Sequence, residues 1–139
     1  MSPPGHRPPG APRLPDLGSP TATAALLRSV SRIQDAWGLS EQELARLLGC
    51  SADILTQWRT EPPSAGLSDV TLLRISHLAT IYVALHELFP DPGRADAWIR
   101  RPNQAPALRG RSALERMLDG DLSDLATIRQ YLDAQRFGC

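Results

Sequence analysis

Residues 40–59, SEQELARLLGCSADILTQWR, are the stretch that decides the fold. Ser40 followed three positions later by Glu43 makes a capping box, which is typical of the beginning of a helix. The apolar residues that follow recur at helical spacing: Leu44, Ala45, Leu47 and Leu48. Gly49 suits the left-handed conformation that ends a helix, and Ser51 can cap a second helix with Ile54, Leu55 and Trp58 on one face. Two short helices joined in this way predict a helix-turn-helix.

The second helix of this motif carries the candidate DNA-binding residues. Those off its apolar face, with its N-terminal cap, are Ser51, Ala52, Asp53, Thr56, Gln57 and Arg59. In a helix-turn-helix these positions lie in the major groove, and a serine at the helix start suits a phosphate. The alternative is a pair of helices that serves only as scaffold. Because the formal net charge is zero, we expect DNA binding to depend on a local patch and on dimerisation.

The composition of the 139-residue chain predicts one compact domain, or two small subdomains that share a core. Proline and glycine dominate residues 1–20, which are predicted to be a disordered arm. Neither a signal peptide nor a membrane-spanning run is visible, so a cytoplasmic location is expected. Two cysteines, Cys50 and Cys139, and two separated histidines, His77 and His86, give no metal-binding spacing. We therefore expect no metal and no cofactor.

The remaining pattern is helical throughout, so the predicted fold class is all-α. A helix that opens at Thr21 or Thr23 and runs to Trp37 would complete a DNA-binding unit over residues 21–66. The stretch Val70–Phe89, capped by Ser68 or Asp69, predicts a long central helix within residues 67–93. This helix is apolar around most of its circumference, so it must be covered on more than one side. We expect the DNA-binding unit on one flank and the C-terminal residues or a second subunit on the other.

Residues 94–139 predict a small helical subdomain. Short helices are expected around Ala95–Ile99 and Ala113–Leu118, with a turn at Pro102-Asn103, and a last helix over Leu122–Gln135. Residues 94–116 are locally basic, with Arg94, Arg100, Arg101, Arg109, Arg111 and Arg116 against two acids. This segment is either a solvated face or a patch for an acidic partner or nucleic acid.

A spaced set of residues in this subdomain resembles a known family. The pattern W-x(3)-P-N-x(4)-L-x-G-x(3)-L-x(3)-L-x-G is matched by Trp98, Pro102-Asn103, Leu108, Gly110, Leu114, Leu118 and Gly120. It is similar to the toxin-binding domain of the Xre/MbcA/ParS antitoxins, which in that family follows an Xre-like helix-turn-helix. Most of this signature has a structural role to expect: Trp98 as an anchor, Pro102 in a turn, and Gly110 and Gly120 in tight turns. This chain departs from the family at Ala113, where proline is common, and in the order Arg136, Phe137, Gly138.

The resemblance implies an antitoxin that neutralises a RES-domain toxin, a protein that uses NAD, and that also represses its own operon. A RES-domain toxin, operator DNA and a second copy of the chain are the expected partners, and no enzymatic activity is expected. The alternative is a stand-alone transcription regulator whose C-terminal half dimerises or senses a ligand. The expected toxin-contacting residues are Arg100, Arg101, Asn103, Arg109, Arg111, Arg136, Phe137, Gly138 and Cys139.

The end of the chain allows two interpretations. Phe137 beside Arg136 suits a pocket with an acidic rim, and the resemblance makes that pocket the NAD cleft of the toxin. Phe137 could instead fold back on Leu132 and close the core of the protein itself.

Overall fold

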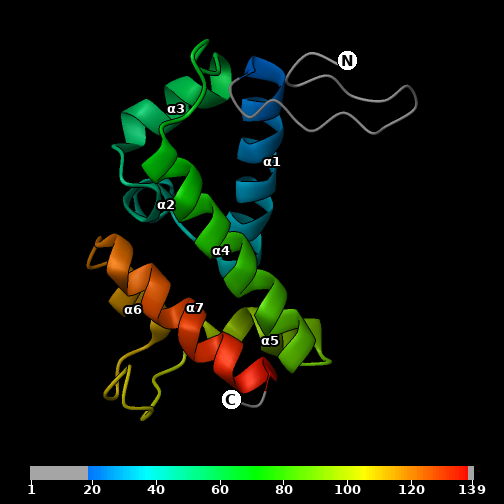
Figure 1. The fold of residues 1–139 in the computed structure, drawn as a ribbon, viewed down its shortest axis with the longest axis vertical. Helices are drawn as coiled ribbons and strands as arrows, with labels where there is room; N and C mark the ends of the chain where they lie inside the picture. The colour runs from blue at the N-terminus through cyan, green and yellow to red at the C-terminus, as the bar shows by residue number, and fades with distance from the viewer. Residues whose placement is uncertain (1–18, 138–139) are drawn as a thin grey trace, which may run out of the picture.

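The computed structural model describes residues 19–137, and these form an all-helical fold (Figure 1), which confirms the predicted fold class. The helices are α1 Pro20–Trp37, α2 Glu41–Leu48, α3 Ala52–Thr60, α4 Asp69–Leu88, α5 Pro92–Trp98, α6 Ala113–Met117 and α7 Leu122–Phe137. Among the described residues, no helix combines the length and the apolar character that a membrane span requires.

Helix α1 begins earlier than the sequence predicted. The hydroxyl of Ser19 accepts a hydrogen bond from the backbone N–H of Ala22 at 3.1 Å, and Pro20 occupies the first turn, where its missing N–H has no cost. Thr23 is fully buried inside the helix and so cannot be its cap. The prediction that Thr21 or Thr23 opens the helix is therefore wrong. Ser19 and Pro20 belong to α1 and not to the arm, whose other residues, 1–18, lie outside the described residues.

Helices α2 and α3 form the predicted helix-turn-helix. Ser40 and Glu43 make both hydrogen bonds of the capping box, and Gly49 ends α2 with φ of 78°. A Cβ atom at Gly49 would lie 3.0 Å from Nε of Arg74, so the tight turn also needs a residue without a side chain. Leu55 of α3 is fully buried, whereas Ile54 is 40% exposed and does not share its face.

Helix α4 is the centre of the fold, as its apolar girth predicted. It begins at the cap Ser68 and ends at Leu88, 20 residues later, and packs against α1 and α2 as well as α5 and α7 (Figure 1). Leu78, Ile81 and Leu85 are fully buried between these neighbours. Three apolar side chains stay at the surface: Val70, Leu73 and Val83, with 55%, 43% and 47% of their area exposed.

The C-terminal helices form the opposite end of the molecule from α3. Pro92 ends the chain's extension beyond α4 and occupies the first turn of α5, with Asp91 as the cap. A capping box between Ser112 and Glu115 begins α6. Helix α7 continues through Phe137, two residues beyond the predicted end. In Figure 1, α3 lies at one end of the long axis, and the C-terminal end of α7 lies at the other.

Candidate functional site

The exposed face of α3 holds most of the residues predicted to contact DNA. Asp53, Thr56 and Gln57 are exposed, and the Ser51 hydroxyl caps the helix by accepting a hydrogen bond from the backbone N–H of Ile54 at 3.2 Å. Ala52 differs from the others because it is half-buried against the core. Gln57 therefore presents an amide, able to donate and accept hydrogen bonds, on the surface that a helix-turn-helix places in the major groove.

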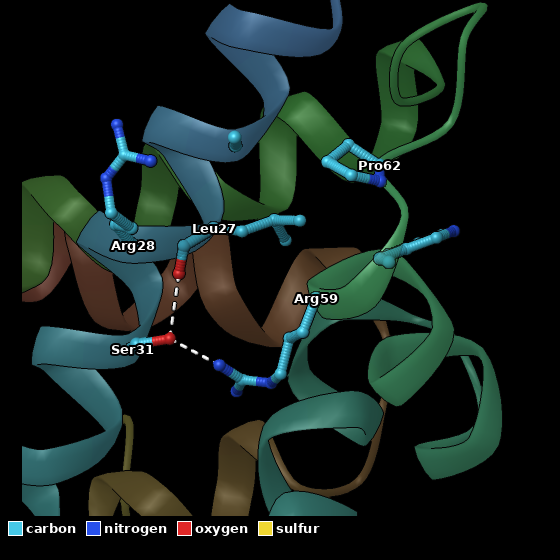
Figure 2. Close-up of a pocket in the computed structure, with 7 residues that line it drawn as sticks. Leu27, Arg28, Ser31, Arg59 and Pro62 are labelled. Atoms are coloured by element: carbon cyan, nitrogen blue, oxygen red, sulfur yellow. Dashed lines mark hydrogen bonds between the residues drawn. The ribbon is translucent and has the colours of Figure 1, made fainter.

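Arg59 points back into the protein rather than along this face. Its guanidinium lies 3.0 Å from a carboxylate oxygen of Glu41 and donates to the side-chain oxygen of Gln34 at 2.7 Å. It also donates to the hydroxyl of Ser31, which in turn donates to the carbonyl oxygen of Leu27 at 2.9 Å (Figure 2). Arg59 thus ties the end of α3 to α1 and α2, and Glu41 neutralises much of its charge.

Arg100 and Arg111, two of the arginines expected to contact the toxin, hold the protein itself together. Arg100 donates to the carbonyl oxygens of Trp37 and Gly38, at 2.9 and 2.7 Å. Arg111 meets both carboxylate oxygens of Asp119 at 3.0 Å. This hydrogen-bonded pair holds the pKa of the Asp119 carboxyl below its ordinary value.

Asn103 closes the loop between α5 and α6. Its side-chain oxygen accepts from the backbone N–H of Ala105 at 2.8 Å, and its own backbone exchanges hydrogen bonds with Gly110 and Arg111. Gly110 adopts φ of 85° at this closure, beside Arg109 with φ of 50°. The side chain of Asn103 therefore shapes the loop, as expected of a turn signal.

Arg101 and Arg109 are the exposed cations of this loop. Within the part of the chain that the structure describes, neither makes a hydrogen bond or an ion pair, and the same holds for Arg94. The nearby signature residue Trp98 stacks on Tyr131, with ring centroids 6.2 Å apart and planes inclined by 13°. The loop thus hangs from a packed aromatic anchor and presents Arg101 and Arg109 to solvent.

Two further arginines, which sequence reasoning missed, join the N-terminal helices to the C-terminal ones. Arg46 donates to the carbonyl oxygens of Leu118 and Asp119, the latter at 3.2 Å. Arg74 donates to the carbonyl oxygens of Leu47 and Gly120, at 3.2 and 2.8 Å. The last carbonyls of a helix have no partner inside the helix, so a guanidinium is well suited to satisfy them.

The C-terminal end of α7 presents an aromatic side chain. Phe137 is 65% exposed, while Leu132 is buried, so the interpretation in which Phe137 folds back and closes the core is wrong. Arg136 is bonded to Asp133 and Glu87, each at 3.2 Å, and its guanidinium lies 4.4 Å from the centre of the Phe137 ring. Gly138 and Cys139, the other expected contacts of the tail, lie outside the described residues.

Comparison with known proteins identifies both halves of this arrangement. Residues 16–79 match the antitoxin Xre-like helix-turn-helix domain, and residues 84–138 match the antitoxin Xre/MbcA/ParS C-terminal toxin-binding domain. The uncharacterized protein y4oB of Sinorhizobium fredii (strain NBRC 101917 / NGR234) is 43% identical over 114 residues, which cover 82% of this chain and 86% of that protein. The chain therefore belongs to the family of antitoxins that join an Xre-like helix-turn-helix to an Xre/MbcA/ParS toxin-binding domain. Its partner is a toxin, and its helix-turn-helix is of a kind associated with DNA binding.

Proposed function

We propose that this antitoxin inhibits a RES-domain toxin that uses NAD, and that it represses its own operon by binding DNA as a homodimer. The observation that carries the proposal is the arrangement of its two surfaces on one body. The exposed face of α3 and the exposed Phe137 lie at opposite ends of the molecule (Figure 1), so each can be occupied without covering the other. The proposed boundaries are residues 21–66 for the DNA-binding unit, 67–93 for the central helix and turn, and 94–139 for the toxin-binding part.

On the toxin side, the proposal assigns contact to Arg101, Arg109 and the tail from Phe137 onward. These arginines make no bond within residues 19–137, and Phe137 is the most exposed large apolar side chain of that range. An aromatic anchor that enters the NAD cleft of the toxin would exclude NAD by occupying its space. Arg100, Arg111 and Arg136 support this surface from behind, because their guanidinium groups are already bonded within the chain.

Co-expression with a RES-domain protein encoded beside the gene tests this function. The two proteins should co-purify, and cells that produce the toxin should keep their NAD and grow only when the antitoxin is present. A toxin mutated in its NAD site serves as the control for binding without activity. A pair that fails to co-purify, or NAD loss that the antitoxin does not prevent, would leave only the DNA-binding half of the proposal.

On the DNA side, two copies of α3 would meet two half-sites, as dimeric helix-turn-helix proteins do. The exposed apolar residues Val70, Leu73 and Val83 recur along one side of α4, which offers a surface on which two copies could pack. Light scattering of the isolated protein should give the mass of a dimer. Leu73→Glu should shift it to a monomer with unchanged helix content, and a dimer that persists in this variant would place the contact elsewhere.

A further inference from the structure

The face of α3 has little free positive charge. Arg59 is its only basic residue, and the guanidinium of Arg59 is bonded to Glu41, Gln34 and Ser31. The other ionisable groups on and just after α3 are the acids Asp53 and Glu61. DNA binding requires cations that replace the counterions of the phosphates. The cations that meet the backbone must therefore come from another element.

Helix α1 offers two such cations. Arg28 and Arg32 are both exposed, and neither makes a hydrogen bond or an ion pair with another residue of the described range. They stand one helical turn apart, which is about 6 Å along the axis. Like charges at this spacing destabilise a helix slightly, so intrahelical stability does not account for the pair. An anionic partner would turn this repulsion into attraction.

The position of α1 beside α3 is fixed by the contacts of Arg59. Arg28 lines a hollow of about 330 Å³ between α1 and the end of α3, together with Trp58, Arg59 and Pro62. Figure 2 shows Arg28 on the α1 side of this hollow and Arg59 reaching across from α3 to Ser31. The free guanidinium of Arg28 is therefore carried on the helix that flanks α3, with Arg32 on the next turn.

We propose that Arg28 and Arg32 bind the phosphate backbone of a DNA duplex that is seated on α3. This inference rests on the proposed operator binding and adds to it the source of the electrostatic attraction. Contacts to phosphates fix the register of a protein on the duplex and carry no sequence information of their own. Base preference then belongs to the α3 side chains, and salt sensitivity belongs to α1.

The salt dependence of binding tests the inference. The probe is a labelled duplex from the region upstream of the gene, with its dissociation constant measured between 50 and 200 mM salt, a range in which phosphate contacts dominate. Each of Arg28→Gln and Arg32→Gln should reduce the slope of log affinity against log salt by about 0.9, and the double variant by about 1.8. Competition with duplexes of altered sequence should show an unchanged base preference. Arg28→Lys with Arg32→Lys should keep most of the slope, because the charge remains.

Arg94→Gln is the matched control, since it removes an exposed and unpaired arginine from α5, at the far end of the molecule from α3. Its slope should equal that of the wild type. A double variant of α1 that keeps the wild-type slope would overturn the inference and leave operator binding intact, as would a change in base preference. Wild-type protein that binds no duplex at 50 mM salt would overturn operator binding and this inference together. Equal melting temperatures would establish that the substitutions leave the fold intact.

Discussion

The guanidinium Nε of Arg100 donates a hydrogen bond to the backbone carbonyl oxygen of Trp37 at 2.9 Å, across 63 positions of the chain. Trp37 is 2% exposed and stands at the C-terminal end of α1. The residue after α5 therefore satisfies a carbonyl that the helix-turn-helix half leaves without an intrahelical partner. Arg46 and Arg74 repeat this arrangement between other elements of the two halves.

Removing this link should destabilise the whole protein. Arg100→Gln loses the hydrogen bonds to Trp37 and Gly38, and we expect a loss of about 1–2 kcal/mol in the free energy of unfolding, because the site is partly exposed. Urea denaturation measures the change. Arg101→Gln, the neighbouring arginine without such bonds, should change stability by less than about 0.5 kcal/mol. Equal effects of the two substitutions would mean that the link contributes nothing.

Truncation in the middle of α4 should be far more costly. Leu78 is fully buried, so Leu78→Ala should reduce the free energy of unfolding by about 2–5 kcal/mol. Leu73 on the same helix is 43% exposed, and the matched substitution Leu73→Ala should lose less than about 1 kcal/mol in the monomer. Thermal denaturation followed by circular dichroism compares them. A similar loss for both would contradict the burial of α4 described above.

The exposed polar face of α3 should determine DNA affinity. A Thr56→Ala, Gln57→Ala double variant removes a hydroxyl and an amide that are exposed in the free protein, and we expect operator binding to be lost in a gel shift. The salt slope of any residual binding should stay close to that of the wild type, since both side chains are neutral. Unchanged affinity would show that this helix does not contact the bases.

The tail can be tested without disturbing α7. A chain that ends at Arg136 lacks Phe137 but keeps the ion pair between Arg136 and Glu87, which holds the last turn of α7 on α4. This protein should remain folded and still bind the toxin, yet release much of the NAD-consuming activity. Full inhibition by the shortened protein would move neutralisation to Arg101 and Arg109.

His77 should make stability depend on pH. Burial and the nearby Arg129 lower the pKa of His77 below its ordinary value of 6.5, so the folded state favours the neutral ring. The resulting stability is complete above the unfolded pKa and is lost as the pH falls through the folded pKa. Arg129→Gln should raise the pKa of His77 in an NMR titration, and His77→Gln should remove this part of the pH dependence. A pKa that does not move would assign the shift to burial alone.

The local signals of the sequence predicted most of the fold correctly. The capping box of Ser40 and Glu43 depends on residues three positions apart, and Gly49 follows from the turn itself, so each is visible in a short window. The start of α1 was misplaced because a Ser-Pro pair at residues 19–20 was assigned to the arm. The face of Ile54 was misassigned because a nine-residue helix can turn either neighbouring residue inward.

The candidate site was harder to predict, because its arginines are sorted by distant partners. Arg59 meets Glu41 across 18 positions, and Arg100 meets Trp37 across 63. No local pattern distinguishes such an arginine from Arg101, which has no partner within the described residues. A basic run therefore predicts that charge is present, and only the packed helices show which charges are available to another molecule.

The two family matches meet between residues 79 and 84, in the interior of α4. No linker separates the DNA-binding half from the toxin-binding half, and the buried residues on either side of the junction belong to one core. Such a body unfolds cooperatively. A cellular protease that pulls on either end would therefore eliminate both surfaces in one event. Repression and neutralisation would then share a single lifetime in the cell, and neither could outlast the other.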